Sequence, residues 1–236
     1  MPVKQRYWAV IPAAGAGTRM GTEMPKQYLK MGEKCVLEHV LEKFCRHPAL
    51  EKIILALVKD DPYWRSLKIS SHPGIETVEG GVERCHSVLN GLRALDGLAQ
   101  PDDWVLVHDA ARPCIRPEDI DHLIAELDDH PVGGILAVPV RDTMKRSGEG
   151  REIRETVERN GLWHALTPQM FRLALLREAM EKALERGSLV TDEAQAVEFT
   201  GRRPLLVQGH GDNIKVTRPE DLPLAEFFIS QQEKSA

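Results

Sequence analysis

The fold of this chain is decided by the stretch Trp8-Ala-Val-Ile-Pro-Ala-Ala-Gly-Ala-Gly-Thr-Arg-Met20. The residues from Tyr7 to Ile11 are apolar, which predicts a short buried strand. Residues 13–17 are all alanine or glycine, so a ligand could lie directly on their backbone, and glycine permits a positive φ. Consecutive N–H groups in such a loop form a concave anion site. The stretch therefore predicts a strand, a loop that cradles a polyphosphate, and a helix.

Two cationic residues, Arg19 and Lys26, follow this loop in a chain whose formal net charge is −5. The loop lacks the third glycine of the dinucleotide-binding fingerprint, and no Gly-Lys-Ser/Thr follows it as in a Walker A loop. A plain tight turn remains an alternative, because small residues alone mark turns as well. The position after a strand, together with the two cations, favours phosphate binding.

The composition is that of an ordinary globular protein, with 236 residues, 42% hydrophobic and 28% charged. An acidic balance argues against nonspecific nucleic-acid binding, so we expect no nucleic-acid partner. No apolar run approaches the roughly 20 residues that a membrane helix needs, so we expect no membrane partner. The four cysteines are scattered and form no C-x-x-C pair, which suggests free thiols in a cytoplasmic protein. The N-terminus leaves no room for a signal peptide before the first strand.

Apolar strands alternate with amphipathic helices along most of the chain. We expect strands at residues 7–11, 52–58, 75–78, 104–107, 134–140 and 205–208. The expected helices are one from 36 to just before Pro48, a short one at 60–67, and further ones at 83–95, 117–127, 173–186, 192–200 and 220–232. This alternation predicts an α/β fold with a mostly parallel sheet covered on both faces. Ligands then bind beyond the carboxyl ends of the strands.

Residues 141–159 break the pattern, because they are polar, rich in charges and carry Gly148 and Gly150. Such a segment predicts a protruding hairpin or arm and not a part of the core. We find no linker, repeat or low-complexity tract, so the chain is expected to form a single domain over residues 1–236 with an arm at about 141–159.

Asp109 follows the strand 104–107 and is the carboxylate best placed for chemistry. It could bind Mg²⁺, which prefers oxygen ligands and substrate phosphates; it could accept ribose hydroxyls, or it could simply cap a helix. His108 is treated as structural. Arg112 could bind a substrate phosphate or form a surface ion pair. At Gly80-Gly81 a planar base could approach the backbone, or the pair could be an ordinary turn.

Several motifs occur in order along the chain: Pro-Ala-Ala-Gly-x-Gly-x-Arg-Met, Pro-Lys-Gln-Tyr-Leu, Val-His-Asp-Ala-Ala-Arg-Pro, Pro-Val-Arg-Asp-Thr-Met-Lys, Asn-Gly-Leu-Trp-His-Ala-Leu-Thr-Pro-Gln, Thr-Asp-Glu-Ala and Asp-Asn-Ile-Lys-Val-Thr-Arg-Pro-Glu-Asp-Leu. Together they resemble the 2-C-methyl-D-erythritol 4-phosphate cytidylyltransferases of the non-mevalonate isoprenoid pathway. The resemblance spans nearly the whole chain. It implies a Rossmann-like fold of the nucleotide-diphospho-sugar transferase type, transfer of CMP from CTP to methylerythritol phosphate, and use of Mg²⁺ or another divalent cation.

The same resemblance assigns roles to particular residues. The implied catalytic residues are Arg19, Lys26, Arg159 and Lys215. The implied nucleotide-binding residues are Pro12, Ala13, Ala14, Gly15, Gly81, Ser87, Asp109 and Ala110. The implied residues for the second substrate are Arg112, Thr143, Arg159, Thr167, Thr191 and Lys215, and Asp109 is the implied metal ligand. The family also implies a homodimer with interlocking arms, so that Arg159 would complete the active site of the neighbouring subunit.

One departure concerns Val82, because many relatives carry Asp at this position of the Gly-Gly-x-Glu-Arg segment. Two other functions stay open from the sequence alone. The first is a cytidylyltransferase for another polyol phosphate, such as ribitol phosphate. The second is a nucleotide-binding regulator without catalysis, which would bind CTP but release no pyrophosphate.

Overall fold

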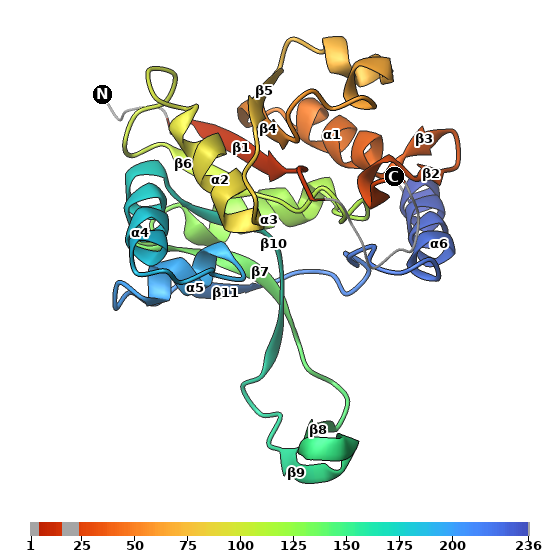
Figure 1. The fold of residues 1–236 in the computed structure, drawn as a ribbon, viewed down its shortest axis with the longest axis vertical. Helices are drawn as coiled ribbons and strands as arrows, with labels where there is room; N and C mark the ends of the chain where they lie inside the picture. The colour runs from red at the N-terminus through yellow and green to blue at the C-terminus, as the bar shows by residue number, and fades with distance from the viewer. Residues whose placement is uncertain (1–4, 16–23, 236) are drawn as a thin grey trace.

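The computed structural model describes residues 5–15 and 24–235. Its centre is a seven-stranded sheet with the strand order β11-β7-β10-β6-β1-β4-β5 (Figure 1). Neighbouring strands run parallel except at β10, which is antiparallel to both β6 and β7. The strands are β1 (Tyr7–Pro12), β4 (Leu50–Leu57), β5 (Ile75–Glu79), β6 (Trp104–Val107), β7 (Gly133–Pro139), β10 (Trp163–Arg172) and β11 (Leu205–Gln208).

Helices cover both faces of the sheet, as expected. The helices on these faces are α1 (Val36–Arg46), α2 (Arg84–Arg93), α3 (Pro117–Leu127), α4 (Leu173–Glu185) and α5 (Glu193–Glu198). A further helix, α6 (Asp221–Ser235), packs in a separate small cluster with Met31. A small hairpin of β2 (Lys30–Met31) and β3 (Lys34–Cys35) precedes α1. These helices lie within three residues of the ranges expected from periodicity and capping signals, and Pro117 occupies the first turn of α3 as expected.

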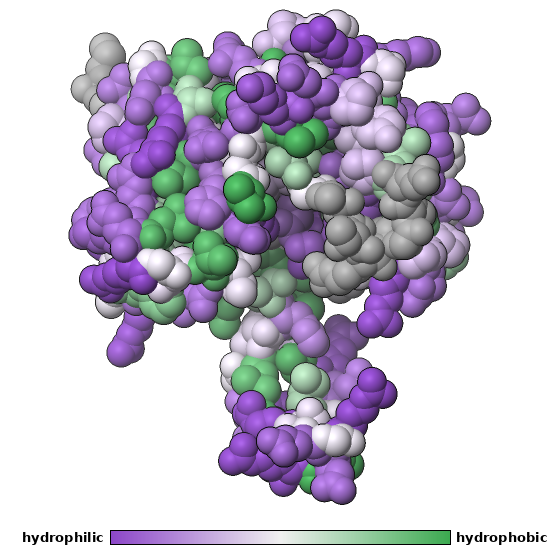
Figure 2. All heavy atoms as spheres, in the orientation of Figure 1, coloured by the Kyte–Doolittle hydropathy of each residue, from purple (hydrophilic) through white to green (hydrophobic). Residues whose placement is uncertain are grey.

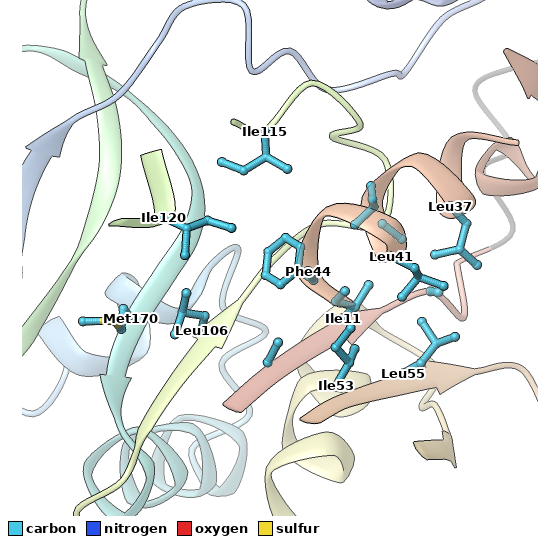
Figure 3. Close-up of a cluster of buried hydrophobic side chains, with 14 of the residues drawn as sticks. Ile11, Leu37, Leu41, Phe44, Ile53, Leu55, Leu106, Ile115, Ile120 and Met170 are labelled. Atoms are coloured by element: carbon cyan, nitrogen blue, oxygen red, sulfur yellow. The ribbon is translucent and has the colours of Figure 1, made fainter. Parts of the chain in front are cut away.

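Alternation along β1 divides the core into two layers. Ala9 and Ile11 pack in the cluster that contains residues of α1 and α3, where Phe44 lies at the centre of the close-up in Figure 3. Trp8 and Val10 pack in the cluster that contains residues of α2, α4 and α5. Because successive side chains point to opposite faces, a strand that is apolar at every position must be buried on both.

The antiparallel strand β10 was not predicted from the sequence. It contains Thr167, Pro168 and Gln169, and its register against β7 shifts between Ala165 and Gln169. Proline cannot donate a hydrogen bond to a sheet, so the interrupted pattern concealed a central strand. The shift leaves Thr167 and Gln169 buried and free to use their side chains for other contacts.

The helix expected at residues 60–67 is wrong. The structure has two short 3₁₀ turns there, η3 (Trp64–Ser66) and η4 (Lys68–Ser71). The Asp61 carboxylate accepts hydrogen bonds from the N–H groups of Tyr63 and Trp64, at 2.9 and 3.0 Å. These local bonds compete with a longer helix.

The expected arm leaves the body from the ends of β7 and β10 and protrudes well away from it (Figure 1). Its tip is a two-stranded antiparallel sheet of β8 (Met144–Ser147) and β9 (Ile153–Val157), joined by η5 (Glu149–Arg151). Residues 141–156 are all exposed, and hydrophilic side chains dominate the tip in Figure 2. Ile153 is nevertheless 68% exposed, and Met144, which pairs with Val157 at the other end of the hairpin, is exposed as well.

Three of the four cysteines, Cys35, Cys85 and Cys114, are free and buried, and Cys45 is free and half-buried. Within residues 5–15 and 24–235, no helix has the length and apolar character required to cross a membrane.

Candidate active site

A pocket of about 370 Å³ lies at the carboxyl ends of β1 and β6, where a parallel sheet binds its ligands. Its walls come from the segment after β1, from η2 (Lys26–Tyr28), from the N-terminal end of α2, and from the segments after β6 and β11. The lining residues are Pro12, Ala13, Ala14, Gly15, Lys26, Gln27, Gly81, Val82, Glu83, Arg84, Ser87, Asp109, Ala110, Ala111, Lys215 and Thr217. All eight residues predicted to bind the nucleotide are among them, together with the predicted catalytic residues Lys26 and Lys215. The structure brings these residues together, and their individual roles remain predictions.

One wall is built almost without side chains. A Cβ at Gly80 would lie 2.4 Å from the Cβ of Ala14, and a Cβ at Gly81 would lie 2.2 Å from the Cβ of His86. The Gly81 N–H donates to the Ser87 hydroxyl at 3.0 Å, so the glycine turn is held against α2. The glycine turn packs so closely on its neighbours that no side chain fits there, and the adjacent Val82 lines the pocket with 95% of its surface exposed.

Gln27 holds the described part of the loop after β1. Its buried side-chain amide donates to the carbonyl oxygens of Ala13 and Gly15, at 2.7 and 3.4 Å. The neighbouring Lys26 donates from its ammonium group to the carbonyl oxygen of Val216 at 3.0 Å. These bonds place the Lys26 ammonium group close to the segment that carries Lys215. Arg19 lies outside the residues that the structure describes, so its expected place near the triphosphate stays a prediction.

Asp109 is the centre of the charge arrangement at the pocket. Its carboxylate Oδ1 accepts from Arg84 Nε at 2.9 Å, and Oδ2 lies 2.8 Å from Lys215 Nζ and 3.5 Å from Arg112 Nε. Burial alone would raise the pKa of this carboxyl, but Arg84, Lys215 and Arg112 outweigh burial and hold the pKa well below its usual range. Asp109 is therefore charged at any pH near neutral, and its hydrogen bonds do not support the helix-cap alternative.

Arg84 and Glu193 belong to this arrangement and were not singled out from the sequence. Glu193 is completely buried, and its oxygens Oε1 and Oε2 accept from the two terminal nitrogens of Arg84 at 2.7 and 3.2 Å. Although burial disfavours the charged guanidinium, Glu193 and Asp109 raise the pKa of Arg84 above its ordinary value. The signal available in the sequence was their place in two of the quoted motifs, Gly-Gly-Val-Glu-Arg84 and Thr-Asp-Glu193-Ala.

Thr167 fixes the backbone at Asp109. Its hydroxyl accepts from the Asp109 N–H at 3.1 Å and lies 2.9 Å from Nδ1 of His108, whose Nε2 lies 3.1 Å from the carbonyl oxygen of Arg112. These three contacts are satisfied together when His108 is neutral, with its proton on Nε2. Burial lowers the pKa of His108 to about 3, which agrees with the structural role expected for it.

Arg112 is not a surface residue, and the surface ion-pair alternative is wrong. Its side chain is only 11% exposed, and its terminal nitrogens donate to the carbonyl oxygens of Asn213 and Ala165, at 2.8 and 3.4 Å. The guanidinium is thus fixed beside Asp109 by the 212–217 segment and by β10. Three residues predicted to bind the second substrate thus gather around Asp109: Arg112 and Lys215 at Oδ2, and Thr167 at the backbone N–H. Of these three, only Lys215 lines the pocket.

Three other predicted residues lie apart from this pocket. Thr143 and Arg159 are exposed residues of the arm, and Arg159 donates to the carbonyl oxygen of Arg141 within it. Thr191 is exposed, and its hydroxyl bonds to the Gln195 side chain at 3.3 Å. The residue after it, Asp192, caps α5 by accepting from the Gln195 N–H at 3.0 Å.

The residues at the pocket provide few ligands for a metal ion. Among the described residues, no group of three or more His, Cys, Asp or Glu side chains is arranged to hold one. The Asp109 carboxylate points into the charged cluster, and each of its oxygens has lone pairs beyond those used by its present partners. The donor set fits a Mg²⁺ ion that receives most of its ligands from a bound phosphate chain.

The ammonium groups of Lys26 and Lys215 lie beside the loop after β1, which has no bulky side chains. Such an arrangement suits a reaction in which two phosphate groups must approach each other, because the positive charges reduce their repulsion. Such chemistry depends on positioning and on charge stabilisation more than on a covalent intermediate. Fold and pocket together define a nucleotidyltransferase. The model of the family "2-C-methyl-D-erythritol 4-phosphate cytidylyltransferase" (IspD) matches residues 7–231, and the chain belongs to this family.

Curated relatives and solved structures agree with this assignment. A protein of Vibrio vulnificus strain CMCP6, named 2-C-methyl-D-erythritol 4-phosphate cytidylyltransferase, is 54% identical over 95% of this chain and 94% of its own length. A protein of the same name from Pseudomonas fluorescens is 54% identical over 92% of both chains. The crystal structure of a 4-diphosphocytidyl-2C-methyl-D-erythritol synthase superposes with a TM-score of 0.84 at 41% identity, covering 96% of this chain and 99% of the other. The enzyme of that family from Francisella tularensis gives a TM-score of 0.83 at 36% identity, over 95% and 100% of the two chains.

The buried, neutral His108 predicts a pH dependence of folding stability. Its pKa is about 3 in the folded protein, against 6.5 for an ordinary exposed histidine, so only the unfolded chain takes up this proton between those two pH values. The stability that the folded protein gains from a neutral His108 is fully present above pH 6.5, and it is lost as the pH falls towards 3. In His108→Gln, the fall in the free energy of unfolding between pH 6.5 and 4 should be shallower by up to about 1.4 kcal/mol per pH unit.

Urea unfolding at a series of pH values measures this slope. Parallel curves for the wild type and His108→Gln would show that the histidine is not held neutral in the folded protein.

Proposed function

We propose that this protein transfers CMP from CTP to 2-C-methyl-D-erythritol 4-phosphate, giving 4-diphosphocytidyl-2-C-methyl-D-erythritol and pyrophosphate, in the biosynthesis of isoprenoid precursors. The observation that carries the proposal is 54% identity, over 95% of the chain, with a curated enzyme named for this cytidylyl transfer. A reaction in the cytoplasm fits the free thiols of the chain.

The chemical step is an in-line displacement at phosphorus. A phosphate oxygen of the acceptor attacks the α-phosphorus of CTP, a new P–O bond forms, and the bond to the bridging oxygen of the β-phosphate breaks, so that pyrophosphate leaves with the electron pair. The attacking phosphate monoester is already largely a dianion near neutral pH, so the reaction needs no strong general base. The main obstacle is repulsion between the two anions, which fixed cations reduce.

The described cations divide between the two substrates. Lys26 lies between the loop after β1 and Val216, where it would contact the triphosphate, with Arg19 as its predicted partner. Lys215 and Arg112 lie at Oδ2 of Asp109, on the side where we place the acceptor phosphate. Because Asp109 fixes both of these cations, it would separate the two substrate sites without reacting itself.

Mg²⁺ or another divalent cation would supply the remaining charge. Asp109 is the carboxylate of the described pocket best placed to hold it, and the triphosphate would supply most of the other ligands. Bound in this way, the metal would withdraw charge from the phosphates during transfer.

Selection of the base would depend on the backbone at the glycine turn. Gly80 and Gly81 have no room for a side chain, and Ser87 is committed to the Gly81 N–H. The apolar Val82 cannot hydrogen-bond to a base, so we propose that main-chain groups of this turn recognise cytosine while Val82 covers it.

We further propose that the active enzyme is a homodimer with composite sites. Arg159 and Thr143 lie on an arm that protrudes from its own body, as Figure 1 shows, and neither lines the pocket. The exposed apolar side chains of Met144 and Ile153 on the arm are suited to burial against another subunit. An arm of this kind would place Arg159 and Thr143 at the acceptor site of the neighbouring subunit.

Pyrophosphate release with CTP and methylerythritol phosphate tests the proposed function. We expect release that requires both substrates and ceases when a chelator removes divalent cations, because the phosphates then lose their charge compensation. Ribitol 5-phosphate in place of methylerythritol phosphate distinguishes the nearest alternative. Binding of CTP without pyrophosphate release, in the presence of either acceptor and Mg²⁺, would instead indicate a regulator.

Replacement of Lys26 tests the triphosphate side. Loss of one preorganised charge contact typically lowers the rate by about 10²–10³, so Lys26→Ala should lower kcat by that factor while the KM for the acceptor changes far less. Lys52→Ala is the matched control, because Lys52 pairs with Glu76 at the surface. A loss of under about fivefold in Lys26→Ala would remove this lysine from the transition state.

Mixing of inactive subunits tests the composite site. Lys26→Ala and Arg159→Ala subunits are each expected to be inactive as homodimers. After random exchange half of the dimers are mixed, and each mixed dimer has one site with an intact Lys26 and an intact Arg159 from its partner. Activity should therefore recover to about a quarter of wild type for a two-fold dimer. If Arg159 serves its own subunit, activity stays at the level of the mutants after verified exchange.

A further inference from the structure

Two charged side chains near the pocket, Arg84 and Glu193, form a buried pair across two helices. Arg84 is the first residue of α2, and Glu193 is the first residue of α5. The contact is bidentate, at 2.7 and 3.2 Å, and none of Glu193 is exposed. Replacing a buried ion pair by apolar residues is often neutral or stabilising, so stability alone gives little reason for the pair.

The third contact of the guanidinium suggests the reason. Arg84 Nε donates to Oδ1 of Asp109 at 2.9 Å, while both terminal nitrogens are used by Glu193. The planar fork of an arginine therefore sets the angle between Glu193 and the Asp109 carboxylate, which a lysine could not do. Because Arg84 occupies Oδ1 of Asp109, the other oxygen, Oδ2, contacts Lys215 Nζ at 2.8 Å.

The two chain neighbours of Glu193 are held by β10. The Gln169 side chain is almost completely buried, and it accepts from the Ala194 N–H at 2.8 Å and donates to Asp192 Oδ2 at 3.0 Å. The N-terminal end of α5 is thus fixed to the central sheet. Gln169 thus holds the two neighbours of Glu193, and hydrogen bonds run on from the Glu193 side chain through Arg84 to Asp109.

The charges exclude a simpler role for Arg84. Arg84 lines the pocket, but its positive charge is compensated by Glu193 and Asp109 and three of its five N–H groups are used by them, so it offers less charge to a triphosphate than an uncompensated cation would. Lys215, in contrast, is paired with only one oxygen of Asp109 and lines the pocket.

We propose that Arg84 and Glu193 are positioning residues for the transfer reaction: Glu193 orients Arg84, and Arg84 fixes the Asp109 carboxylate so that the Lys215 ammonium group stands where the acceptor phosphate binds. The inference rests on the proposed function. We therefore expect the pair to affect kcat and the binding of the acceptor, but not the binding of CTP.

Three variants separate positioning from a purely structural role: Arg84→Met, Glu193→Leu, and the double variant with both changes. Each single variant leaves one buried charge without its partner, so its thermal midpoint should fall. The double variant has no unpaired member of the pair and should regain most of that stability.

Activity should not follow stability. A misplacement of about 1 Å at a reacting centre can cost about 10²-fold, so we expect kcat in the double variant to stay about 10- to 100-fold below wild type. The dissociation constant for CTP, measured by calorimetry without divalent cations, should stay within about threefold of wild type because Lys26 and the loop after β1 are unchanged. Recovery of kcat to within about threefold of wild type, together with stability, would overturn the proposal.

A milder variant covers the case in which the double variant does not fold. Glu193→Gln keeps the size of the side chain and one acceptor for Arg84 but loses the two-point contact, so kcat should fall about tenfold while the thermal midpoint falls less than in Glu193→Leu. An unchanged kcat in folded Glu193→Gln would also overturn the proposal.

The matched control is another Arg–Glu pair made by α2. Arg93, at the other end of the helix, contacts Glu181 of α4 at 3.0 Å, far along α2 from the pocket. Arg93→Met with Glu181→Gln should leave kcat unchanged. Wild-type enzyme without pyrophosphate release would mean that the proposed function itself has failed, a result distinct from any outcome among the variants.

Discussion

The buried carboxylate of Asp109 is the constraint on which the rest of the site depends. A charged carboxylate with 7% of its residue surface exposed is costly unless it is paired and hydrogen-bonded. Arg84, Arg112 and Lys215 provide the pairing, and each of them comes from a different part of the chain. Asp109 and its three partners therefore join α2, the end of β6 and the 212–217 segment at one place.

The same carboxylate links the core to the reaction. Its backbone is fixed by Thr167 from β10, and its side chain is fixed through Arg84 by Glu193, which β10 also holds through Gln169. The antiparallel strand thus supports Asp109 from both sides. A site held by a rigid sheet and by buried hydrogen bonds keeps its cations in place before the substrates bind, which is what electrostatic stabilisation of a transition state requires.

Much of the fold could be predicted from local patterns. The apolar runs of β1 and β6 and the capping signals of α3 are readable because burial on both faces and helix termini leave marks within a few residues. The strand β10 could not be predicted in this way. Pro168 and the polar residues around it break the pattern, and their reason lies in partners such as Asp109 and Asp192, which are distant in the sequence.

The sequence by itself determined the α/β class, the small-residue loop, the arm and the set of motifs that mark the family, because each depends on residues close together in the chain. Only the tertiary structure showed that Asp109 has three cationic partners, that Arg84 belongs to Glu193, and that Thr143 and Arg159 stand apart from the pocket of their own subunit. The physical reason is that a buried charge is stabilised by neighbours in space, whereas a periodic pattern records only neighbours in sequence.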